Sequence, residues 1–247
     1  MQCVILAGGL ATRLGDLAAT VPKALLPVAG RPFADHQLEW LARDGVTDVV
    51  YCIAHLGDAI RAHVGDGERF GLRVAYVDEG KDLRGTGGAL RLAYDEGALE
   101  ESFAVLYGDS YLPVDVSDVY ADFERRRPDV LMTVFRNDGR FDRSNAALER
   151  DGRVRYDKAV PDPAAAGMRH IDYGLSIVAR DRVVPELPPG ERADLADLYA
   201  RLSAEGRVLG REVHERFYEI GSRAGLAELE ALLACSAPST RLTETSP

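Results

Sequence analysis

The residues best suited to chemistry lie near the start of the chain. An apolar run ending at Ala7 is followed by two glycines, Gly8 and Gly9, and then by two cations, Arg13 and Lys23. Paired glycines after a first parallel strand let backbone N–H groups approach a ligand, and open α/β sheets bind ligands at that edge. Two cations of different geometry beside such a loop suit a polyphosphate. This stretch therefore predicts a nucleoside triphosphate site.

The loop matches neither of the common nucleotide-binding motifs. The pattern GxxxxGK[ST] fails at every lysine, and GxGxxG requires a glycine two residues after Gly8 or Gly9. The glycine pair alone is also typical of a tight turn, and each cation alone is typical of a solvated surface. The prediction depends on their combination.

A second candidate for chemistry is Asp109, which follows the apolar run at residues 103–107 after one glycine. A carboxylate directly after a strand is well placed to hold Mg²⁺, which prefers oxygen ligands and bridges phosphates. The alternative is an aspartate that caps a helix or shapes a turn.

These residues need a sheet to position them, and short apolar runs alternate with helical patterns along the first half of the chain. We predict strands at residues 3–7, 48–54, 73–77, 103–107 and 130–135. We predict helices between them at residues 33–43, 58–64, 87–94 and 116–126. Four crossovers in sequence predict an α/β fold with a doubly wound sheet.

The pattern changes after about residue 128. Asp151-Gly152 favours a tight hairpin turn between residues 147–150 and 153–157, so a more antiparallel region begins here. We predict a strand at 170–179, a helix at 192–204, extended chain at 213–220 and a helix at 224–234. The tail at residues 236–247 is rich in Ser, Thr and Pro and is expected to be disordered.

Composition excludes several classes of protein. Of 247 residues, 40 are acidic and 30 are basic, and the net charge of −10 disfavours nucleic acid and anionic membranes as partners. No run approaches the roughly 20 apolar residues of a membrane span, and the first residues do not form a secretory signal, so we expect a cytoplasmic protein. Cys3, Cys52 and Cys235 have no CxxC spacing, which indicates neither a disulfide framework nor a zinc cluster. The five histidines are scattered, and none is assigned to catalysis.

Six segments together resemble a known signature. They are GGLATRL at 8–14, PKALLPV at 22–28, LRGTGGAL at 83–90, LYGD at 106–109, IDYGL at 171–175 and YEIGS at 218–222. This set resembles the sugar-1-phosphate nucleotidyltransferases, which make nucleotide-sugars. The chain looks most like the compact bacterial members, such as heptose 1-phosphate guanylyltransferases and N-acetylmuramate 1-phosphate uridylyltransferases.

The resemblance implies a fold, a reaction and a division of the chain. The fold is a Rossmann-like mixed sheet of the nucleotide-diphospho-sugar transferase type with a smaller antiparallel part. One domain would cover residues 1–235, with nucleotide binding in 1–112 and sugar binding in 113–235. The reaction joins a nucleoside triphosphate and a sugar 1-phosphate, with Mg²⁺ as cofactor, and releases pyrophosphate. The enzyme would be a monomer or a homodimer.

The resemblance also implies site residues. Arg13 and Lys23 would be catalytic, and Asp109 and Glu219 would hold the metal. Glu219 stands where the family has aspartate, and Ala11 where it usually has glycine. These departures leave open the second metal ligand and the conformation of the loop.

The nucleotide and the sugar phosphate have separate sets of residues. The expected nucleotide-binding residues are Leu6, Ala7, Gly8, Gly9, Thr12, Glu79, Gly85 and Thr86. The expected sugar phosphate-binding residues are Asn145, Lys158, Asp172 and Gly174.

The base is left open by the sequence. Glu79 suits guanine, which presents two donors on one edge, so GTP is favoured weakly over UTP, dTTP or CTP. Uracil and thymine also present an N–H, and Glu79 can equally be a solvated loop charge. The main alternative function is a nucleotide-sugar sensor without catalysis, although Arg13, Lys23 and Asp109 are all retained.

Overall fold

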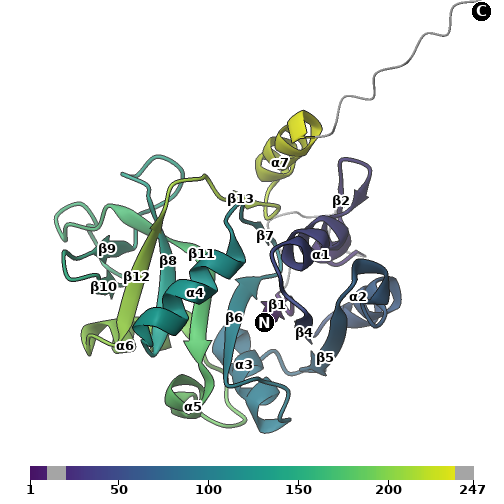
Figure 1. The fold of residues 1–247 in the computed structure, drawn as a ribbon, viewed down its shortest axis with the longest axis horizontal. Helices are drawn as coiled ribbons and strands as arrows, with labels where there is room; N and C mark the ends of the chain where they lie inside the picture. The colour runs from purple at the N-terminus through teal and green to yellow at the C-terminus, as the bar shows by residue number, and fades with distance from the viewer. Residues whose placement is uncertain (10–20, 237–247) are drawn as a thin grey trace, which may run out of the picture.

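A computed structural model describes residues 1–9 and 21–236 of the chain (Figure 1). Ala11, Thr12 and Arg13 therefore lie outside the described residues, as does the tail from residue 237. A nine-stranded sheet runs through the molecule in the order β10-β9-β11-β6-β1-β4-β5, with β8 paired to β11 and β12 paired to β8. The predicted α/β class with a Rossmann-like mixed sheet is confirmed.

The first half of the sheet is parallel and surrounds β1 (Gln2–Leu6). Its other strands are β4 (Asp48–Ile53), β5 (Arg73–Asp78) and β6 (Ser102–Tyr107). Each predicted strand here is confirmed to within one residue at either end. Strands buried on both faces have nearly continuous apolar sequences, which is why these runs are visible without any other information.

Helices cover both faces of the sheet. Cys3 and Ile5 pack in one core with α1 (Phe33–Arg43), α2 (Gly57–Val64) and α4 (Val116–Arg126). The alternate residues of β1, Val4 and Leu6, pack in a second core with α3 (Gly85–Asp95), α5 (Arg180–Val183) and α6 (Leu195–Ala204). Successive side chains of a strand point to opposite faces, so one five-residue strand anchors both helix layers.

The second half differs from a simple continuation of crossovers. The predicted strand at 130–135 is present as β8 (Val130–Arg136), but it does not pair with β6. Instead β11 (His170–Ala179) lies antiparallel between β6 and β8. The Asp151-Gly152 hairpin is confirmed and joins β9 (Ala146–Leu148) to β10 (Val154–Tyr156).

Two predicted elements near the end of the chain are wrong in their bounds. The extended segment lies mainly at β12 (Val208–Val213), which pairs in parallel with β8, rather than at 213–220. Its sequence, VLGREV, has glycine and charges within it, so pairing rather than local preference stabilises the strand. The helix predicted from 192 begins at Leu195, because the Asp194 side chain accepts from the N–H of Ala196 at 2.9 Å and caps it.

Short elements complete the structure around one end of the sheet. They are the hairpin of β2 (Pro27–Val28) and β3 (Arg31–Pro32), the pair of β7 (Ser110–Tyr111) and β13 (Tyr218–Glu219), and α7 (Arg223–Ser236). Single-turn 3₁₀ helices lie at Lys23–Leu25, Glu68–Phe70 and Val184–Glu186. A small core of Val28, Phe33, Ile220 and Leu229 holds α7 against the β2–β3 hairpin and β13.

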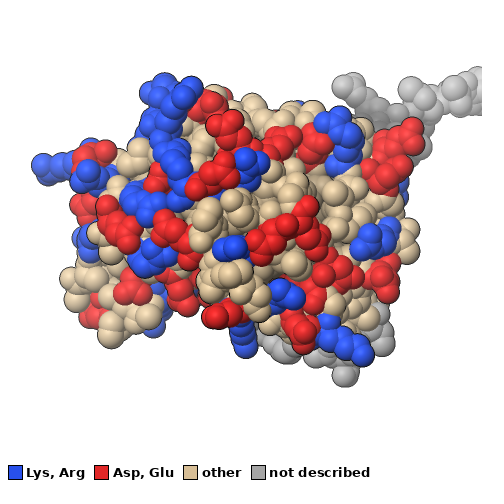
Figure 2. Space-filling model, turned by 90° about the horizontal axis from the view of Figure 1, so that it is seen from below, with Lys and Arg blue, Asp and Glu red and all other residues tan. Residues whose placement is uncertain are grey.

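The surface and the cysteines agree with an ordinary globular domain. On the face seen in Figure 2, acidic and basic side chains alternate, so that face carries no extended field of one sign. Cys3 and Cys52 are fully buried and pack in the core. Among the described residues, no helix is both long and apolar enough to cross a membrane.

Candidate active site

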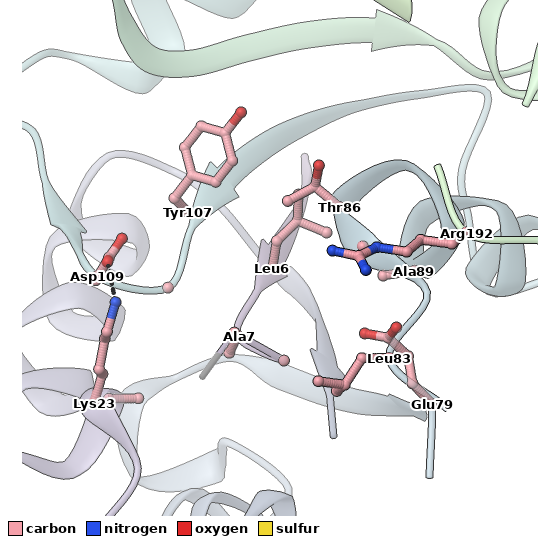
Figure 3. A pocket seen from close by; sticks show the side chains of 15 residues that line it. Leu6, Ala7, Lys23, Glu79, Leu83, Thr86, Ala89, Tyr107, Asp109 and Arg192 are labelled. Atoms are coloured by element: carbon pink, nitrogen blue, oxygen red, sulfur yellow. Dashed lines mark hydrogen bonds and ion pairs between the residues drawn. The ribbon is translucent and has the colours of Figure 1, made fainter. Parts of the chain in front are cut away.

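A cavity of about 440 Å³ opens at the carboxyl ends of β1, β5 and β6 (Figure 3). Parallel strands bring the residues that follow them to one edge, so positions distant in sequence meet here. Every described residue of the predicted nucleotide set lines this cavity, namely Leu6, Ala7, Gly8, Gly9, Glu79, Gly85 and Thr86. Lys23 and Asp109 line it as well.

Lys23 and Asp109 form an ion pair in the cavity wall. Lys23 begins a 3₁₀ turn after Pro22, and Asp109 comes two residues after β6. The Lys23 Nζ atom donates to Oδ2 of Asp109 at 2.9 Å (Figure 3). The two side chains are 22% and 28% exposed, so both remain accessible to a ligand in the cavity. The structure thus places a cation and a candidate metal-binding carboxylate side by side.

Glu79 lines the cavity and is not a solvated loop charge. It follows β5, is 7% exposed, and its Oε2 accepts from the backbone N–H of Arg84 at 2.7 Å. Burial raises the pKa of the Glu79 carboxyl above its usual value, and the hydrogen bond from Arg84 opposes that shift. The alternative of a solvated charge is therefore wrong.

Gly8 is close to Glu79, and this contact explains why a glycine is needed. A Cβ atom at Gly8 would lie 2.6 Å from Oε1 of Glu79 and 3.3 Å from the Cβ of Ala54. At Gly9, by contrast, an added Cβ would meet nothing within 4 Å in the described part of the chain. The described residues thus give a packing reason for glycine at Gly8.

We expect Gly8→Ala to raise the KM for the nucleoside triphosphate about 10-fold, because the new methyl group displaces Glu79 from the cavity wall. The control is the same change in a Glu79→Ala background, where Gly8→Ala should change this KM less than about 2-fold because the side chain that the methyl group displaces is absent. Steady-state kinetics in the two backgrounds measures the difference. An equal change in KM in both backgrounds would contradict a role for the Gly8–Glu79 contact.

The rear wall of the cavity comes from two distant segments joined by hydrogen bonds. Thr86 donates its hydroxyl to Oδ1 of Asp194 at 2.9 Å and accepts from the backbone N–H of Leu195 at 2.9 Å. The Ala193 carbonyl accepts from the N–H of Gly87 at 2.9 Å. The Thr86 hydroxyl is therefore engaged in holding α6 against α3, which leaves its backbone to face a ligand.

Six residues of the cavity were missed by the sequence prediction: Ala24, Leu83, Ala89, Tyr107, Gly108 and Arg192. Leu83 and Tyr107 lie inside motifs that resemble the family, so their place in the wall follows from their neighbours. Arg192 precedes α6, and Figure 3 shows its side chain pointing into the space between Thr86 and Glu79. It has no local sequence signal, since only the contact between α3 and α6 brings it here.

The predicted sugar phosphate residues form a second group, beside the cavity. The backbone N–H of Asp172 donates to Oδ1 of Asn145 at 2.8 Å, and Oδ1 of Asp172 accepts from the N–H of Gly174 at 3.0 Å. The Asn145 carbonyl accepts from the N–H of Asp157 at 2.9 Å, which brings the adjacent Lys158 close. The structure gathers all four predicted residues.

The group around Asp172 contains a carboxyl with a raised pKa and a β-bulge. Burial raises the pKa of the Asp172 carboxyl, while the hydrogen bond from Gly174 and the charge of Lys158 oppose that shift. The pairing of β11 with β8 shifts register between Asp172 and Ser176, and Gly174 within this bulge has φ +100°. Asp172 still pairs with Val134, and regular pairing is interrupted directly after it, where Gly174 adopts a conformation that favours glycine.

Tyr107 connects the two groups. Its ring lines the nucleotide cavity, and a Cβ atom at Gly174 would lie 3.7 Å from its Cδ2 atom. Burial raises the pKa of Tyr107, and the charge of Asp172 raises it further. The cavity and the Asp172 group are therefore neighbours across one tyrosine ring.

Glu219 lies on β13 beside Asp109 and is not among the described residues that line the cavity. Its strand pairs with β7, where Glu219 lies opposite Ser110, and the N–H of Ile220 donates to the carbonyl of Asp109 at 2.9 Å. A Cβ atom at Gly221 would lie 3.6 Å from Oδ2 of Asp109. The segment carrying Glu219 therefore lies against Asp109. In the described part of the chain, no three His, Cys, Asp or Glu side chains converge on a metal position by themselves.

Known proteins are similar in sequence to this chain. A profile of the nucleotidyl transferase family matches residues 2–146. Glucose-1-phosphate thymidylyltransferase of Streptomyces griseus is 35% identical over 136 residues, which cover 55% of this chain and 38% of that protein. N-acetylmuramate alpha-1-phosphate uridylyltransferase of Caulobacter vibrioides is 28% identical over 239 residues, which cover 94% of this chain and 96% of that protein.

The fold is also shared with a solved structure. HddC from Yersinia pseudotuberculosis, crystallised with GMP-PN, has a TM-score of 0.72 at 21% identity, covering 94% of this chain and 99% of that chain. The chain spans about half the length or less of several curated relatives that it matches, with 56% for one uridylyltransferase and 38% for the Streptomyces griseus protein. The family match at residues 2–146 covers more than half of the chain, so the chain belongs to the nucleotidyl transferase family.

Proposed function

We propose that the protein is a sugar-1-phosphate nucleotidyltransferase. An oxygen of a sugar 1-phosphate attacks the α-phosphorus of a nucleoside triphosphate, and the bond to pyrophosphate breaks. The observation that carries this proposal is the position of Lys23 and Asp109 in the wall of a cavity that borders the Asp172 group. Two substrates placed in these neighbouring sites would meet beside a cation and a carboxylate.

The residues of the site can neutralise and orient two polyanions. Lys23 would stabilise negative charge at the α-phosphate, and Arg13 would bind the β- and γ-phosphates. Lys158, near Asp172, would bind the phosphate of the acceptor. In such reactions positioning and charge stabilisation dominate, and no covalent intermediate is required. The acceptor phosphate is already anionic at neutral pH, so no general base is needed.

The donor set at Asp109 fits Mg²⁺. Mg²⁺ is bound through one or two carboxylates while it keeps waters and substrate phosphates as its other ligands. Asp109 is accessible and the Glu219 strand lies against it, so two carboxylates suffice without a complete protein cage. When bound, the ion would supply charge neutralisation at the phosphates. Asp109 and Glu219 would hold it.

Glu79 would read the base. Its carboxylate is fixed in the cavity wall beside Gly8, where it can accept hydrogen bonds from a ring. Guanine offers two donors on one edge and uracil or thymine offers one, so we favour GTP over UTP, dTTP or CTP. The relatives differ in base, since their names specify thymidylyl and uridylyl transfer and the Yersinia structure holds GMP-PN.

This role predicts a pH dependence. The raised pKa of Glu79 means that its carboxylate is lost earlier than that of an ordinary glutamate as pH falls. The neutral acid is a poorer acceptor, so KM for the nucleotide should rise as pH falls from about 7 towards 5. Glu79→Gln should raise KM roughly 10-fold at pH 7, and the gap from the wild type should narrow on acidification. If the ratio of the nucleotide KM of Glu79→Gln to that of the wild type stayed constant across pH, the role of Glu79 in base recognition would be contradicted.

The proposed reaction is tested by Mg²⁺-dependent pyrophosphate release. Each common nucleoside triphosphate is paired with hexose, aminosugar, muramate and heptose 1-phosphates, with Asp109→Asn protein as the blank. Release that requires one acceptor and one triphosphate is expected. Protein that binds a triphosphate but releases no pyrophosphate with any acceptor would instead support the sensor.

A further inference from the structure

Arg192 is a cation at the nucleotide cavity that has no partner in the described part of the chain. It lines the cavity and is exposed, and its side chain makes no hydrogen bond or ion pair with any described residue. Lys23, the other cation among the described lining residues, is paired with Asp109. Arg192 can therefore bind a ligand without giving up a contact to a described residue.

The backbone that carries Arg192 is fixed against the start of α3. The N–H of Ala193 donates to the carbonyl of Arg84 at 2.9 Å. The carbonyl of Ala193 accepts from the N–H groups of Gly87 at 2.9 Å and Gly88 at 3.2 Å. An anchored backbone needs no ordering when a ligand binds, so a contact made by Arg192 costs less entropy than one made from a free loop.

Glycines of the LRGTGGAL segment make this close packing possible. A Cβ atom at Gly85 would lie 2.6 Å from the carbonyl oxygen of Ala193. A Cβ atom at Gly88 would lie 2.8 Å from the carbonyl oxygen of Glu191. Both distances are too short for a Cβ atom, so a larger residue at either position would push the segment at 191–193 away from α3. The two glycines therefore keep Arg192 close to the cavity.

Arg192 lies at the end of the cavity that is remote from the residues proposed for the phosphates. In Figure 3, Lys23 and Asp109 lie on one side of Leu6, and Arg192 lies on the other side, with Glu79. The guanidinium group extends into the cavity, and no ion pair joins it to Glu79. Both side chains are thus directed at the part of the cavity where the base would bind.

Glu79 and Arg192 offer opposite hydrogen-bonding chemistry to a base. An ionised glutamate accepts hydrogen bonds only, and an arginine donates them only. Guanine, uracil and thymine have a ring N–H next to a carbonyl oxygen, so they present a donor for Glu79 and an acceptor for Arg192. Adenine and cytosine have an accepting ring nitrogen next to a donating amino group, which reverses both. In the same position these two bases would leave the buried Glu79 carboxylate without a donor.

Resting on the proposed function, we propose that Arg192 binds the base and, together with Glu79, selects a triphosphate whose base has a ring N–H beside a carbonyl oxygen. Arg192 donates to the carbonyl oxygen, and Glu79 accepts from the ring N–H. GTP, UTP and dTTP belong to this class, whereas CTP and ATP do not. A site that hydrogen-bonds one edge of a ligand discriminates strongly, because the wrong ligand leaves its polar groups unpaired.

The test measures triphosphate binding without an acceptor. No nucleotidyl transfer takes place then, so isothermal titration in Mg²⁺ gives the Kd of each triphosphate independently of the reaction. Wild-type protein should bind the best of GTP, UTP and dTTP about 100-fold more tightly than CTP or ATP. Arg192→Met should weaken binding of that best ligand roughly 10-fold and reduce its advantage over CTP and ATP. Equal Kd values for the two classes of base in wild-type protein would overturn the inference.

A thio-substituted base tests the contact itself. The probe is 6-thio-GTP or a 4-thio analogue of UTP or dTTP, according to the base preferred, and its sulfur is a weaker acceptor than the carbonyl oxygen that it replaces. Wild-type protein should bind the thio analogue about 5-fold more weakly than the parent triphosphate, and Arg192→Met should bind both within about 2-fold. The same loss in both proteins would show that Arg192 contacts the ribose or the phosphates, and would overturn the inference.

Arg150→Met is the matched control. Arg150 is exposed in the hairpin between β9 and β10, lies outside the cavity lining, and makes no hydrogen bond or ion pair with a described residue. The variant loses the same charge, and its Kd values should stay within about 2-fold of the wild type. Wild-type Kd values in Arg192→Met would overturn the inference. Base-selective binding that depends on Arg192, with no pyrophosphate release when acceptors are added, would instead overturn the proposed function.

Discussion

Asp109→Asn is expected to lower kcat about 1,000-fold at saturating Mg²⁺ and both substrates. The change keeps the size of the side chain and removes the charge that a metal ion between two polyanions requires. Folding should be nearly unaffected, because the Lys23–Asp109 ion pair is partly exposed and such pairs contribute about 1 kcal/mol or less. We therefore expect Tm to fall by no more than about 4 °C. Pyrophosphate release and thermal unfolding measure the two effects separately.

Asp78→Asn is the matched control for this variant. Asp78 ends the neighbouring strand β5 at the same edge of the sheet, is exposed, and its Oδ1 accepts from the N–H of Gly80 at 2.8 Å. The same chemical change here should alter kcat by less than about 2-fold. An Asp109→Asn enzyme with nearly full activity would remove Asp109 from the metal site, whatever the control shows.

The parallel half of the fold could be predicted because its signals are local. Residues of β1 are buried on both faces and form an unbroken apolar run, and the amphipathic pattern of α1 gives its bounds as Phe33–Arg43. The glycine loop could be predicted because it comes directly after β1. Neighbouring residues in the sequence are sufficient to predict such features.

The second half could not be predicted in the same way because its arrangement depends on long-range pairing. β11 lies between β6 and β8, and no residue in either strand specifies that a later antiparallel strand will separate them. β12 carries Gly210, Arg211 and Glu212, so it lacks an apolar pattern, and its pairing with β8 stabilises it. The register of β11 and β12, and the strands that they pair with, are therefore set by tertiary packing.

The same distinction applies to the site. Glu79, Asp109 and Asp172 each stand next to a strand or within one, and Asp109 and Asp172 also lie inside a motif, which makes them candidates from the amino-acid sequence alone. Arg192 becomes visible only when α6 packs against α3. Chemistry-bearing side chains with a local motif are therefore predictable, whereas the partners that complete their surroundings are not.

Lys23 occupies the carboxylate of Asp109 in this structure and would compete with a metal ion for it. The cation of Lys23 lies 2.9 Å from the carboxylate that we assign to the metal. In the proposed reaction, Lys23 would have to leave Asp109 and move to the α-phosphate as the metal and nucleotide bind. Removing Lys23 should weaken catalysis and, at the same time, free Asp109 for a cation.

Lys23→Met is thus expected to have effects of opposite direction. We expect kcat to fall roughly 300-fold, because charge at the α-phosphate loses its stabilising cation. Binding of Mn²⁺ to the protein without nucleotide should tighten about 5-fold, because the competing ammonium group is gone. Steady-state kinetics and a Mn²⁺ titration followed by electron paramagnetic resonance measure the two effects.

The control for Lys23→Met is Lys81→Met, which removes an exposed lysine from the turn after β5, outside the residues that line the cavity. It makes the same change in net charge, so any general effect of charge on Mn²⁺ binding appears in both variants. We expect neither kcat nor Mn²⁺ affinity to change by more than about 2-fold in Lys81→Met. Weaker Mn²⁺ binding in Lys23→Met would show that lysine and metal do not compete for Asp109, and the metal would then have to be placed elsewhere in the cavity.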